Sequence, residues 1–366
     1  MKFWIVITNL QGGGAERSIL NLASGLIRRG NSVRLILLED RIDHALPPGI
    51  EPLFAAKRGQ TISKGWIGKR VAAWRLRRLI VNDLAGERAD LIISTLPFAD
   101  EVVRIARLRN VWFRITNTLS GEISGLKSIS VKKAKRRLAR YRRLYSGQNL
   151  IAVSEGVAED LRERIGIRSV KTTTIYNPID LEEIHRLSRA TDIDFPPAPF
   201  IVHAGRFVPQ KRHDLLFDAF VASKLPHQLV LMTKSSQRLR SLIAAKGLTD
   251  RVIVVGFVPN PFPWYARASA MVLSSDFEGF PNVLVEGLAC GTPVVSTDCL
   301  SGPNEILTGA LRQYLSPCGD ASALGRNLAS VVESPPVLGS DIVSRFSQDR
   351  SLSALEALAK QKSAPT

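Results

Sequence analysis

The sequence has few cysteines, and their spacing suits neither a disulfide framework nor a zinc site. Cys290, Cys299 and Cys318 are the three cysteines, and none belongs to a Cys-x-x-Cys pair. An odd number without metal-ligand spacing argues against both kinds of site and suits a reducing compartment. We therefore expect three small core residues, no bound metal and a cytoplasmic location.

The sequence also lacks a long apolar run. A membrane-spanning helix needs ~20 consecutive apolar residues, and no segment reaches that length. The opening MKFWIVITNL is apolar, but it lacks the basic lead and the small-residue cleavage site of a signal peptide. We expect it to form a buried first strand, in a protein that lies on a membrane without crossing it.

Acidic residues are scarce relative to basic ones. The chain has 50 Lys and Arg against 33 Asp and Glu, a formal net charge of +17. Such an excess attracts polyanions: nucleic acid, anionic lipid or phosphorylated substrates. The length of 366 residues favours two domains, and 45% hydrophobic with 23% charged residues is typical of globular proteins.

Short apolar runs alternate with helix-length segments along the chain. Runs this short and continuous are typical of strands covered on both faces in parallel sheets. They are 3–8, 33–38, 91–96, 111–115 and 150–154, then 200–204, 228–233, 252–255, 270–274 and 293–296. A helix is predicted over Ser18–Arg29, ending at Gly30. The pattern predicts an α/β protein with two parallel-sheet domains.

A proline-rich stretch separates the two series of strands. Residues 192–199 read DIDFPPAP, which resists both helix and central strand. We place a linker near 178–198, an N-terminal domain at 1–180 and a C-terminal domain at 196–345. Residues 346–366 should form a last helix that packs back on the first domain.

The most informative segment is SSDFEGFPNVLVEGLACGTPVVSTD, residues 274–298. Pro281 suits the start of a helix that should run from Asn282 to Ala289, with Gly291 as its left-handed stop. A helix N-terminus at the carboxyl end of a parallel strand offers free N–H groups to a diphosphate. Glu278 and Glu286 can then accept hydrogen bonds from sugar hydroxyls.

These residues resemble the donor-site signature of glycosyltransferase family 4, whose members retain the configuration of the transferred sugar. The E-x7-E pair, Glu278 and Glu286, lies in EGFPNVLVEGLACGTPVVSTD. Further matches, in family order, are QGGGAERSILNLASGL (11–26), VSEGVAEDL (153–161), IYNPID (175–180), HAGRFVPQKRHDLLFDAF (203–220) and LSGPNEIL (300–307). The resemblance implies the GT-B fold: two Rossmann-like domains facing a central cleft, with the acceptor on the N-terminal side.

The resemblance also implies roles for matched positions. Arg206 and Lys211 would neutralise the donor diphosphate without a metal, and Glu278 would contact the donor sugar. Glu286 would hold the ribose. The backbone around these groups would come from Gly279, Phe280, Pro281, Asn282 and Val283, and from the turn at Gly12, Gly13 and Gly14. No cofactor is expected besides the sugar nucleotide as co-substrate.

Two stretches depart from the family pattern. Members often have a histidine near the donor sugar after a middle strand; here VWFRITNTLS, residues 111–120, has Thr116 or Asn117 at that place, with Arg114 nearby. A Gly-x-Gly turn common after the strand 228–233 is replaced by TKSSQ, residues 233–237. The first removes a histidine-based role, and the second implies an altered loop.

Two basic segments indicate a membrane surface. Residues 64–78, KGWIGKRVAAWRLRR, and 127–143, KSISVKKAKRRLARYRR, are compatible with basic amphipathic helices. Lys and Arg attract anionic lipid and Trp anchors at the interface. We expect peripheral binding to the inner face of the cytoplasmic membrane, and a lipid-linked or membrane-bound glycan as acceptor.

Blander interpretations stay open for each feature. Glu278 and Glu286 suit a solvated helix face, Arg206 and Lys211 ordinary surface charge, and the glycine triplet a ligand-free turn. The run 127–143 suits a solvated face or a polyphosphate-acceptor groove. We expect structural roles for the histidines His185, His203 and His213, and Glu155 suits a helix cap.

Three other functions compete with sugar transfer from a UDP- or GDP-sugar. A nucleic-acid-binding protein would explain the charge, but no recognition motif or interleaved aromatics support it. A non-catalytic sugar-nucleotide-binding subunit would not need both charged pairs. A dinucleotide dehydrogenase lacks its Gly-x-Gly-x-x-Gly fingerprint.

Overall fold

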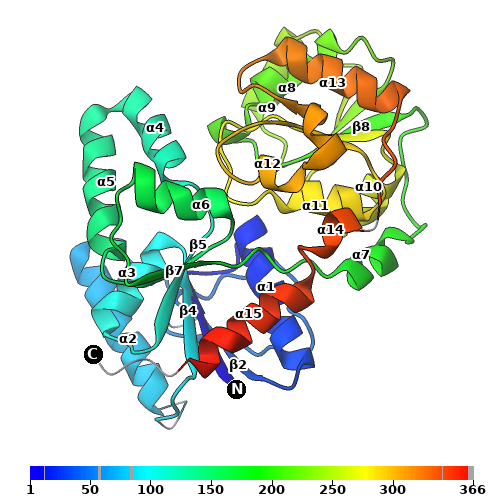
Figure 1. Ribbon diagram of the computed structural model, residues 1–366. Helices are drawn as coiled ribbons and strands as arrows, with labels where there is room; N and C mark the ends of the chain where they lie inside the picture. Colours follow the sequence, from blue (N-terminus) through cyan, green and yellow to red (C-terminus); the bar gives the residue numbers. More distant parts are fainter. Residues whose placement is uncertain (12, 57–58, 83, 85, 340, 362–366) are drawn as a thin grey trace. The chain divides into compact units, whose positions relative to one another are not determined.

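The chain forms two compact units in a computed structural model that describes residues 1–11, 13–56, 59–82, 84, 86–339 and 341–361 (Figure 1). Unit 1 consists of the residues up to Pro178 together with those from Gln348 on, and unit 2 is Ile179–Ser347. The chain therefore passes between the units twice.

Unit 1 is built on a parallel sheet of seven strands within its described residues, in the order β3-β2-β1-β4-β5-β6-β7. The strands are β1 (Lys2–Ile7), β2 (Ser32–Leu37), β3 (Leu53–Phe54), β4 (Leu91–Thr95), β5 (Val111–Ile115), β6 (Asn149–Ala152) and β7 (Lys171–Thr174). Phe3 pairs with Val33 on one side and Leu91 on the other. The inner strands are buried on both faces, which explains their continuous apolar sequences.

The helices of unit 1 connect these strands and cover the sheet. They are α1 (Gly14–Arg28), α2 (Trp66–Asn82), α3 (Pro97–Ala106), α4 (Leu119–Ile129), α5 (Val131–Tyr145), α6 (Glu155–Glu159), the π-helical turn Asp160–Arg164 and α15 (Gln348–Lys360). Helix α1 begins four residues before the predicted Ser18, with Gly13 as its N-cap. It ends at Arg28, one residue before the predicted Arg29, and the predicted stop residue Gly30 follows with a φ of +77°.

The basic segment 127–143 is not one helix. Ser130 separates α4 from α5, and its Oγ accepts a hydrogen bond from the Lys133 amide at 3.4 Å. The serine caps the new helix by satisfying an amide that has no helical partner, and this explains the break.

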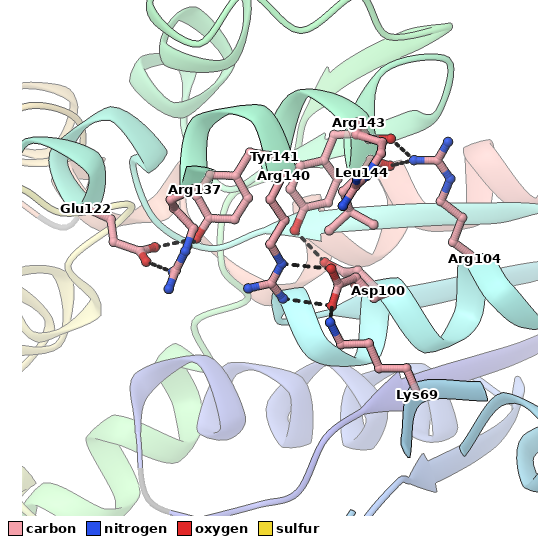
Figure 2. Close-up of polar contacts among 11 residues, drawn as sticks. Lys69, Asp100, Arg104, Glu122, Arg137, Arg140, Tyr141, Arg143 and Leu144 are labelled. Atoms are coloured by element: carbon pink, nitrogen blue, oxygen red, sulfur yellow. Dashed lines mark hydrogen bonds and ion pairs between the residues drawn. The ribbon is translucent and has the colours of Figure 1, made fainter. Parts of the chain in front are cut away.

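Ion pairs fix α5 to its neighbours (Figure 2). Arg140 binds both carboxylate oxygens of Glu101 on α3, at 2.7 and 2.8 Å. Lys69 of α2 reaches the same carboxylate at 2.7 Å. Asp100, the neighbour of Glu101 on α3, is fully buried and accepts hydrogen bonds from Ser94 at 2.6 Å and Tyr145 at 2.8 Å.

Unit 2 contains, in its described residues, a parallel sheet of six strands in the order β10-β9-β8-β11-β12-β13. The strands are β8 (Phe200–Ala204), β9 (Gln228–Met232), β10 (Val252–Val254), β11 (Ala270–Leu273), β12 (Val294–Thr297) and β13 (Leu315–Ser316). The helices are α7 (Leu181–Ser188), α8 (His213–Ala222), α9 (Gln237–Ala245), α10 (Phe262–Arg267), α11 (Asn282–Ala289), α12 (Pro303–Ile306), α13 (Ala321–Glu333) and α14 (Asp341–Ser344), with 3-10 turns at Pro209–Lys211 and Gly309–Tyr314.

The predicted linker at 178–198 contains a helix. Helix α7 packs on α10 and α11 within unit 2, and the His185 ring contacts the Ala289 carbonyl at 3.0 Å. The irregular stretch is therefore shorter than predicted and covers 189–199.

Helix α15 packs on α1 in unit 1 (Figure 1, red beside blue). Leu352, Leu355 and Leu358 enter the same buried cluster as Leu22 and Leu26 of α1. Polar contacts surround this cluster: Gln348 to the Asn21 carbonyl at 2.8 Å, Arg29 to Asp349 and Glu356 at 3.0 and 3.1 Å, and Asn31 to Glu356 at 2.8 Å. The helix thereby completes the core of unit 1.

The expectation that all three cysteines are core residues is wrong for Cys318. Cys299 is buried and Cys290 half-buried, but Cys318 is exposed. It lies in the turn before α13, where Gly319 has a φ of +81°. Among the described residues, none of the helices is both long and apolar enough to span a membrane.

Candidate functional site

The order of strands in unit 2 brings two loops together. Strand β8 has β9 on one side and β11 on the other, so the chain order reverses at β8 and β11. Ligands of open parallel sheets bind at such a reversal, at the carboxyl ends of the strands. The loop after β8 contains Arg206 and Lys211, and the loop after β11 contains Glu278.

Lys211 and Glu278 form an ion pair at this position. The Lys211 Nζ donates to Glu278 Oε1 at 2.6 Å, and the Ser275 hydroxyl donates to the same oxygen at 2.6 Å. Glu278 is only 7% exposed. Within the described residues, both donors reach Oε1 of Glu278 and none reaches Oε2, so Oε2 can accept a further hydrogen bond.

Hydrogen bonds between the two loops fix this pair. Gln210 donates to the Phe277 carbonyl at 2.7 Å, and the Asp276 amide donates to the Gln210 carbonyl at 2.9 Å. The Ser274 hydroxyl donates to the Lys211 carbonyl at 2.8 Å. The charged groups are thus held before any ligand binds, as electrostatic stabilisation of a reaction requires.

Two buried histidines, His203 and His213, lie close enough to Lys211 to be affected by its charge. His203 Nδ1 lies 2.9 Å from the Val272 carbonyl, and its ring meets that of His213 edge-on at 4.9 Å. Burial, followed by the Lys211 charge, lowers the pKa of His213 to about 4. A Cβ on Gly205 would lie 3.1 Å from His203 Nε2 and 3.5 Å from the Lys211 chain. The contact with His203 is the tight one, so Gly205 leaves room for the His203 ring, whereas 3.5 Å from Lys211 is an ordinary van der Waals contact.

Arg206 lies in the same loop without joining the ion pair. Its side chain is exposed and has no carboxylate partner among the described residues. A solvated guanidinium in the same loop as a fixed lysine is available to a bound anion.

The turn before α11 is supported by the LSGPNEIL segment. The Ser301 hydroxyl donates to the Gly279 carbonyl at 2.6 Å, and the Glu278 amide donates to the Leu300 carbonyl at 3.2 Å. Gly302 has a φ of +94°, and a Cβ there would lie 2.4 Å from Pro281 Cδ. Only glycine fits at this position without moving the turn.

The side chains of the turn that were predicted to bind the donor point in different directions. Asn282 and Val283 are half-buried at the start of α11, whose N-cap is Pro281. Phe280 is 6% exposed and its ring packs on Phe346 at 5.1 Å between centroids, so this side chain faces the core. At Phe280, only the backbone is placed to meet a ligand.

Glu286 lies one turn inside α11 and is 5% exposed. Burial first and the charge of Glu286 second raise the pKa of the Cys290 thiol to about 12. The structure thus places Glu286 inside the unit, which excludes the solvated helix face as its environment.

The glycine turn lies in unit 1, after β1. Gly12 lies outside the described residues. Gly13 has an extended φ of −177°, and its amide donates to His44 Nε2 at 3.4 Å. A Cβ on Gly14 would meet no atom within 4 Å, so protein packing does not require glycine there. The space beside Gly14 is open to a ligand.

Several residues of the site were not singled out in the sequence. Gln210, Ser275 and Gly205 support Lys211 and Glu278, but their neighbours along the chain give no sign of these contacts. Among the described residues, no group of three or more His, Cys, Asp or Glu is placed to hold a metal ion.

Comparison with known proteins connects this geometry to a family. The family "Glycosyltransferase Family 4" matches residues 12–183, and "Glycosyl transferases group 1" matches residues 198–334.

An N-acetylgalactosamine-N,N'-diacetylbacillosaminyl-diphospho-undecaprenol 4-alpha-N-acetylgalactosaminyltransferase of Campylobacter jejuni is 30% identical over 313 residues, 83% of each chain. A lipopolysaccharide 1,6-galactosyltransferase of Salmonella typhimurium is 27% identical over 201 residues, 53% of this chain and 55% of that protein.

A solved structure shows the same fold over both units. HepE of Anabaena, in complex with UDP and glucose, superposes with a TM-score of 0.73 at 20% identity, covering 98% of this chain and 100% of that one. The two Rossmann-like units are those of the GT-B fold, as the sequence predicted. The chain belongs to glycosyltransferase family 4, and it is a glycosyltransferase.

Proposed function

We propose that this enzyme transfers a hexose or N-acetylhexosamine, with retention, from a UDP-sugar or a GDP-sugar to a lipid-linked glycan. The ion pair of Lys211 and Glu278 at the strand-order reversal is the observation that carries the proposal. It combines a cation for a diphosphate with a carboxylate for hydroxyls. The names of the Campylobacter and Salmonella relatives support the acceptor class, and UDP in HepE supports the donor class.

Different residues of unit 2 bind different parts of the donor. Lys211 and Arg206 neutralise the diphosphate, and Glu278 accepts hydrogen bonds from the sugar through its open Oε2. Glu286 holds the ribose. The backbone of Gly279–Val283 meets the phosphates and the sugar, while Gly13 and Gly14 in unit 1 meet the donor or acceptor from the first strand–helix turn.

The reaction breaks one bond and forms one. The bond between the sugar C1 and the β-phosphate oxygen breaks, and the acceptor oxygen bonds to C1 from the same face. The acceptor proton goes to the departing phosphate oxygen, which gains negative charge as the bond breaks. Lys211 and Arg206 stabilise that charge, so that the reaction proceeds without a metal ion.

The acceptor would reach the enzyme at an anionic membrane surface, through residues 64–78 and 127–143. On α2, Trp66 is 68% and Trp74 57% exposed, and Val71 is 41% exposed. Arg70 lies over the Trp66 ring at 4.1 Å and Arg78 over Trp74 at 5.5 Å. Aromatic rings flanked by cations are suited to the headgroup layer of a bilayer.

Not all cations of α5 are available to lipid. Arg137 pairs with Glu122, Arg140 with Glu101, and Arg142 donates to the Ile165 carbonyl at 2.7 Å. The exposed cations without such a partner among the described residues are Lys132, Lys133, Lys135, Arg136 and Arg143. A hollow of about 240 Å³ lies beside them, lined by Leu126, Lys133, Arg136, Arg137 and Arg140. We propose peripheral binding to the inner face of the cytoplasmic membrane through this surface.

The function is tested in two steps. UDP, GDP and ADP are screened for thermal stabilisation, and the sugars of the stabilising nucleotide are then assayed for transfer to a polyprenyl-diphosphate-linked glycan. Glu278→Gln should abolish transfer, while Glu333→Gln, an exposed carboxylate in the same unit, should not. A wild-type protein that binds no sugar nucleotide would contradict the proposal.

Membrane binding is tested by sedimentation with phosphatidylglycerol vesicles. Lys132→Gln/Lys135→Gln should bind them more weakly, whereas Lys234→Gln/Arg238→Gln, with the same loss of charge on unit 2, should bind as the wild type does. Equal binding of all three proteins would contradict the proposed surface.

A further inference from the structure

A buried arginine in unit 1 has no counter-charge among the residues that the structure describes. Arg114 lies on β5 and is 2% exposed. Its Nη2 donates to Ser18 Oγ at 2.8 Å and to Asn177 Oδ1, and its Nη1 has no hydrogen-bond partner in the described part of the chain. Within the described residues no carboxylate forms an ion pair with it.

Such a charge is costly to bury. Arginine is almost never buried without a partner, because removal from water disfavours the charged form. Burial alone lowers the pKa of Arg114, to about 10, which leaves the guanidinium charged at neutral pH. A methionine would fill a similar volume without this cost, so the charge calls for a reason other than packing.

The position of Arg114 relative to α1 gives a reason for the buried charge. Ser18 is four residues from Gly14, the first residue of α1, which places the guanidinium about 6 Å along the axis from the helix N-terminus. The first amides of a helix have no partner within the helix and this end has a partial positive charge, and the space beside Gly14 is open. The first turn contains one acidic residue, Glu16, which lies against Gly13 and does not contact Arg114.

We propose that Arg114 is a positioning residue whose buried charge stabilises a phosphate group bound at the N-terminus of α1. The charge acts across the first turns of the helix, and Ser18 holds the helix against the guanidinium. This inference rests on the proposed function. The phosphate belongs either to the sugar nucleotide or to the lipid diphosphate of the acceptor, since both present the same chemistry.

Two substitutions separate charge from shape. Arg114→Met removes the charge at similar volume, and Arg114→Lys keeps it. Arg168→Met removes an exposed charge from the same unit and serves as the control. Thermal unfolding without ligand is measured first, followed by KM and kcat for the sugar nucleotide and for a short-chain polyprenyl-diphosphate glycan.

The charge should matter only when phosphate is bound. Arg114→Met should unfold at or above the wild-type temperature, yet its KM for one of the two substrates should rise about tenfold or more. The substrate affected identifies the source of the phosphate. Arg114→Lys should restore most of the loss, and Arg168→Met should behave as the wild type.

Two results would overturn the inference. If the KM of Arg114→Met is unchanged for both substrates, the charge of Arg114 does not stabilise a bound phosphate. A lowered unfolding temperature would assign Arg114 a structural role instead. Both differ from failure of the proposed function, which would appear in the wild type as absence of sugar-nucleotide binding and transfer.

Discussion

Lys211 and Glu278 lie 67 residues apart in the chain, and their charged atoms meet at 2.6 Å. Their side chains are only 17% and 9% exposed. Water screens such a pair poorly, so each charge depends on the other in the unliganded protein. A donor that engages both must replace part of this interaction with contacts of its own.

Breaking this pair from one side should cost stability, and removing both charges should recover it. Lys211→Met leaves the Glu278 carboxylate buried without its cation, and we expect a loss of about 3 kcal/mol in unfolding free energy. Lys211→Met/Glu278→Gln should regain most of it while remaining inactive. Urea unfolding beside a transfer assay checks both. Additive losses in the double variant would show that the two charges are independent.

Gly302 should be intolerant of a side chain. Gly302→Ala places a Cβ 2.4 Å from Pro281 Cδ at a φ of +94°, so the turn that carries Gly279 must shift. We expect at least about 2 kcal/mol of destabilisation and a raised donor KM. The control is Gly309→Ala, at a φ of +57° with open space around it. An equal effect of both changes would mean that backbone strain alone, and not the contact with Pro281, is responsible.

Asp100 should make stability depend on pH. Burial raises its pKa from 3.8 to about 7, although hydrogen bonds from Ser94 and Tyr145 oppose the rise. Between these two values the folded state keeps a proton that the unfolded state releases, so this group's contribution falls as pH rises, by about 1.4 kcal/mol per unit.

Asp100→Asn removes that dependence and keeps a donor and an acceptor for the two neighbours. The variant should be more stable than the wild type at pH 8 by several kcal/mol, and the difference should shrink towards pH 5. Asp250→Asn, at an exposed site, should show no such trend. Denaturant unfolding at the two pH values measures it, and a difference that is constant with pH would contradict the raised pKa.

Chelation should leave transfer intact. In the proposed mechanism Lys211 and Arg206 would supply the positive charge that a metal ion supplies in other transferases, so excess EDTA should change kcat by less than about twofold. Removal of Arg206 should lower kcat/KM by about tenfold or more, since its guanidinium would contact the donor diphosphate directly. Loss of activity on chelation, restored by Mg²⁺ or Mn²⁺, would contradict the metal-free mechanism.

Local sequence signals predicted the central elements well. The bounds of β5, β8 and α11 are as predicted, because Pro281 marks the start of the helix, Gly291 follows its end, and the two strands are continuous apolar runs. The strands not predicted are β3, β7 and β13, all at sheet edges. Edge strands need no apolar cover on both faces, and β7 reads KTTT with two exposed residues.

The donor residues illustrate what sequence could not give. The E-x7-E motif and GRFVPQK were recognised, and their roles in catalysis stay predictions. The direction of Phe280 depends on Phe346, 66 positions later in the chain, and the contact of Ser275 with Glu278 depends on the loop conformation. In the sequence, Arg114 stands out only by its position, because the lack of an ion-pair partner among the described residues can be seen only in three dimensions.

The return of α15 to α1 has a consequence for biogenesis. Unit 2 is continuous and can finish folding soon after Ser347 leaves the ribosome. Unit 1 is made first but finished last, because Leu352, Leu355 and Leu358 are needed to cover Leu22 and Leu26. During synthesis of the intervening residues, that apolar surface is uncovered, and nascent chains halted before residue 348 should be the ones that chaperones retain.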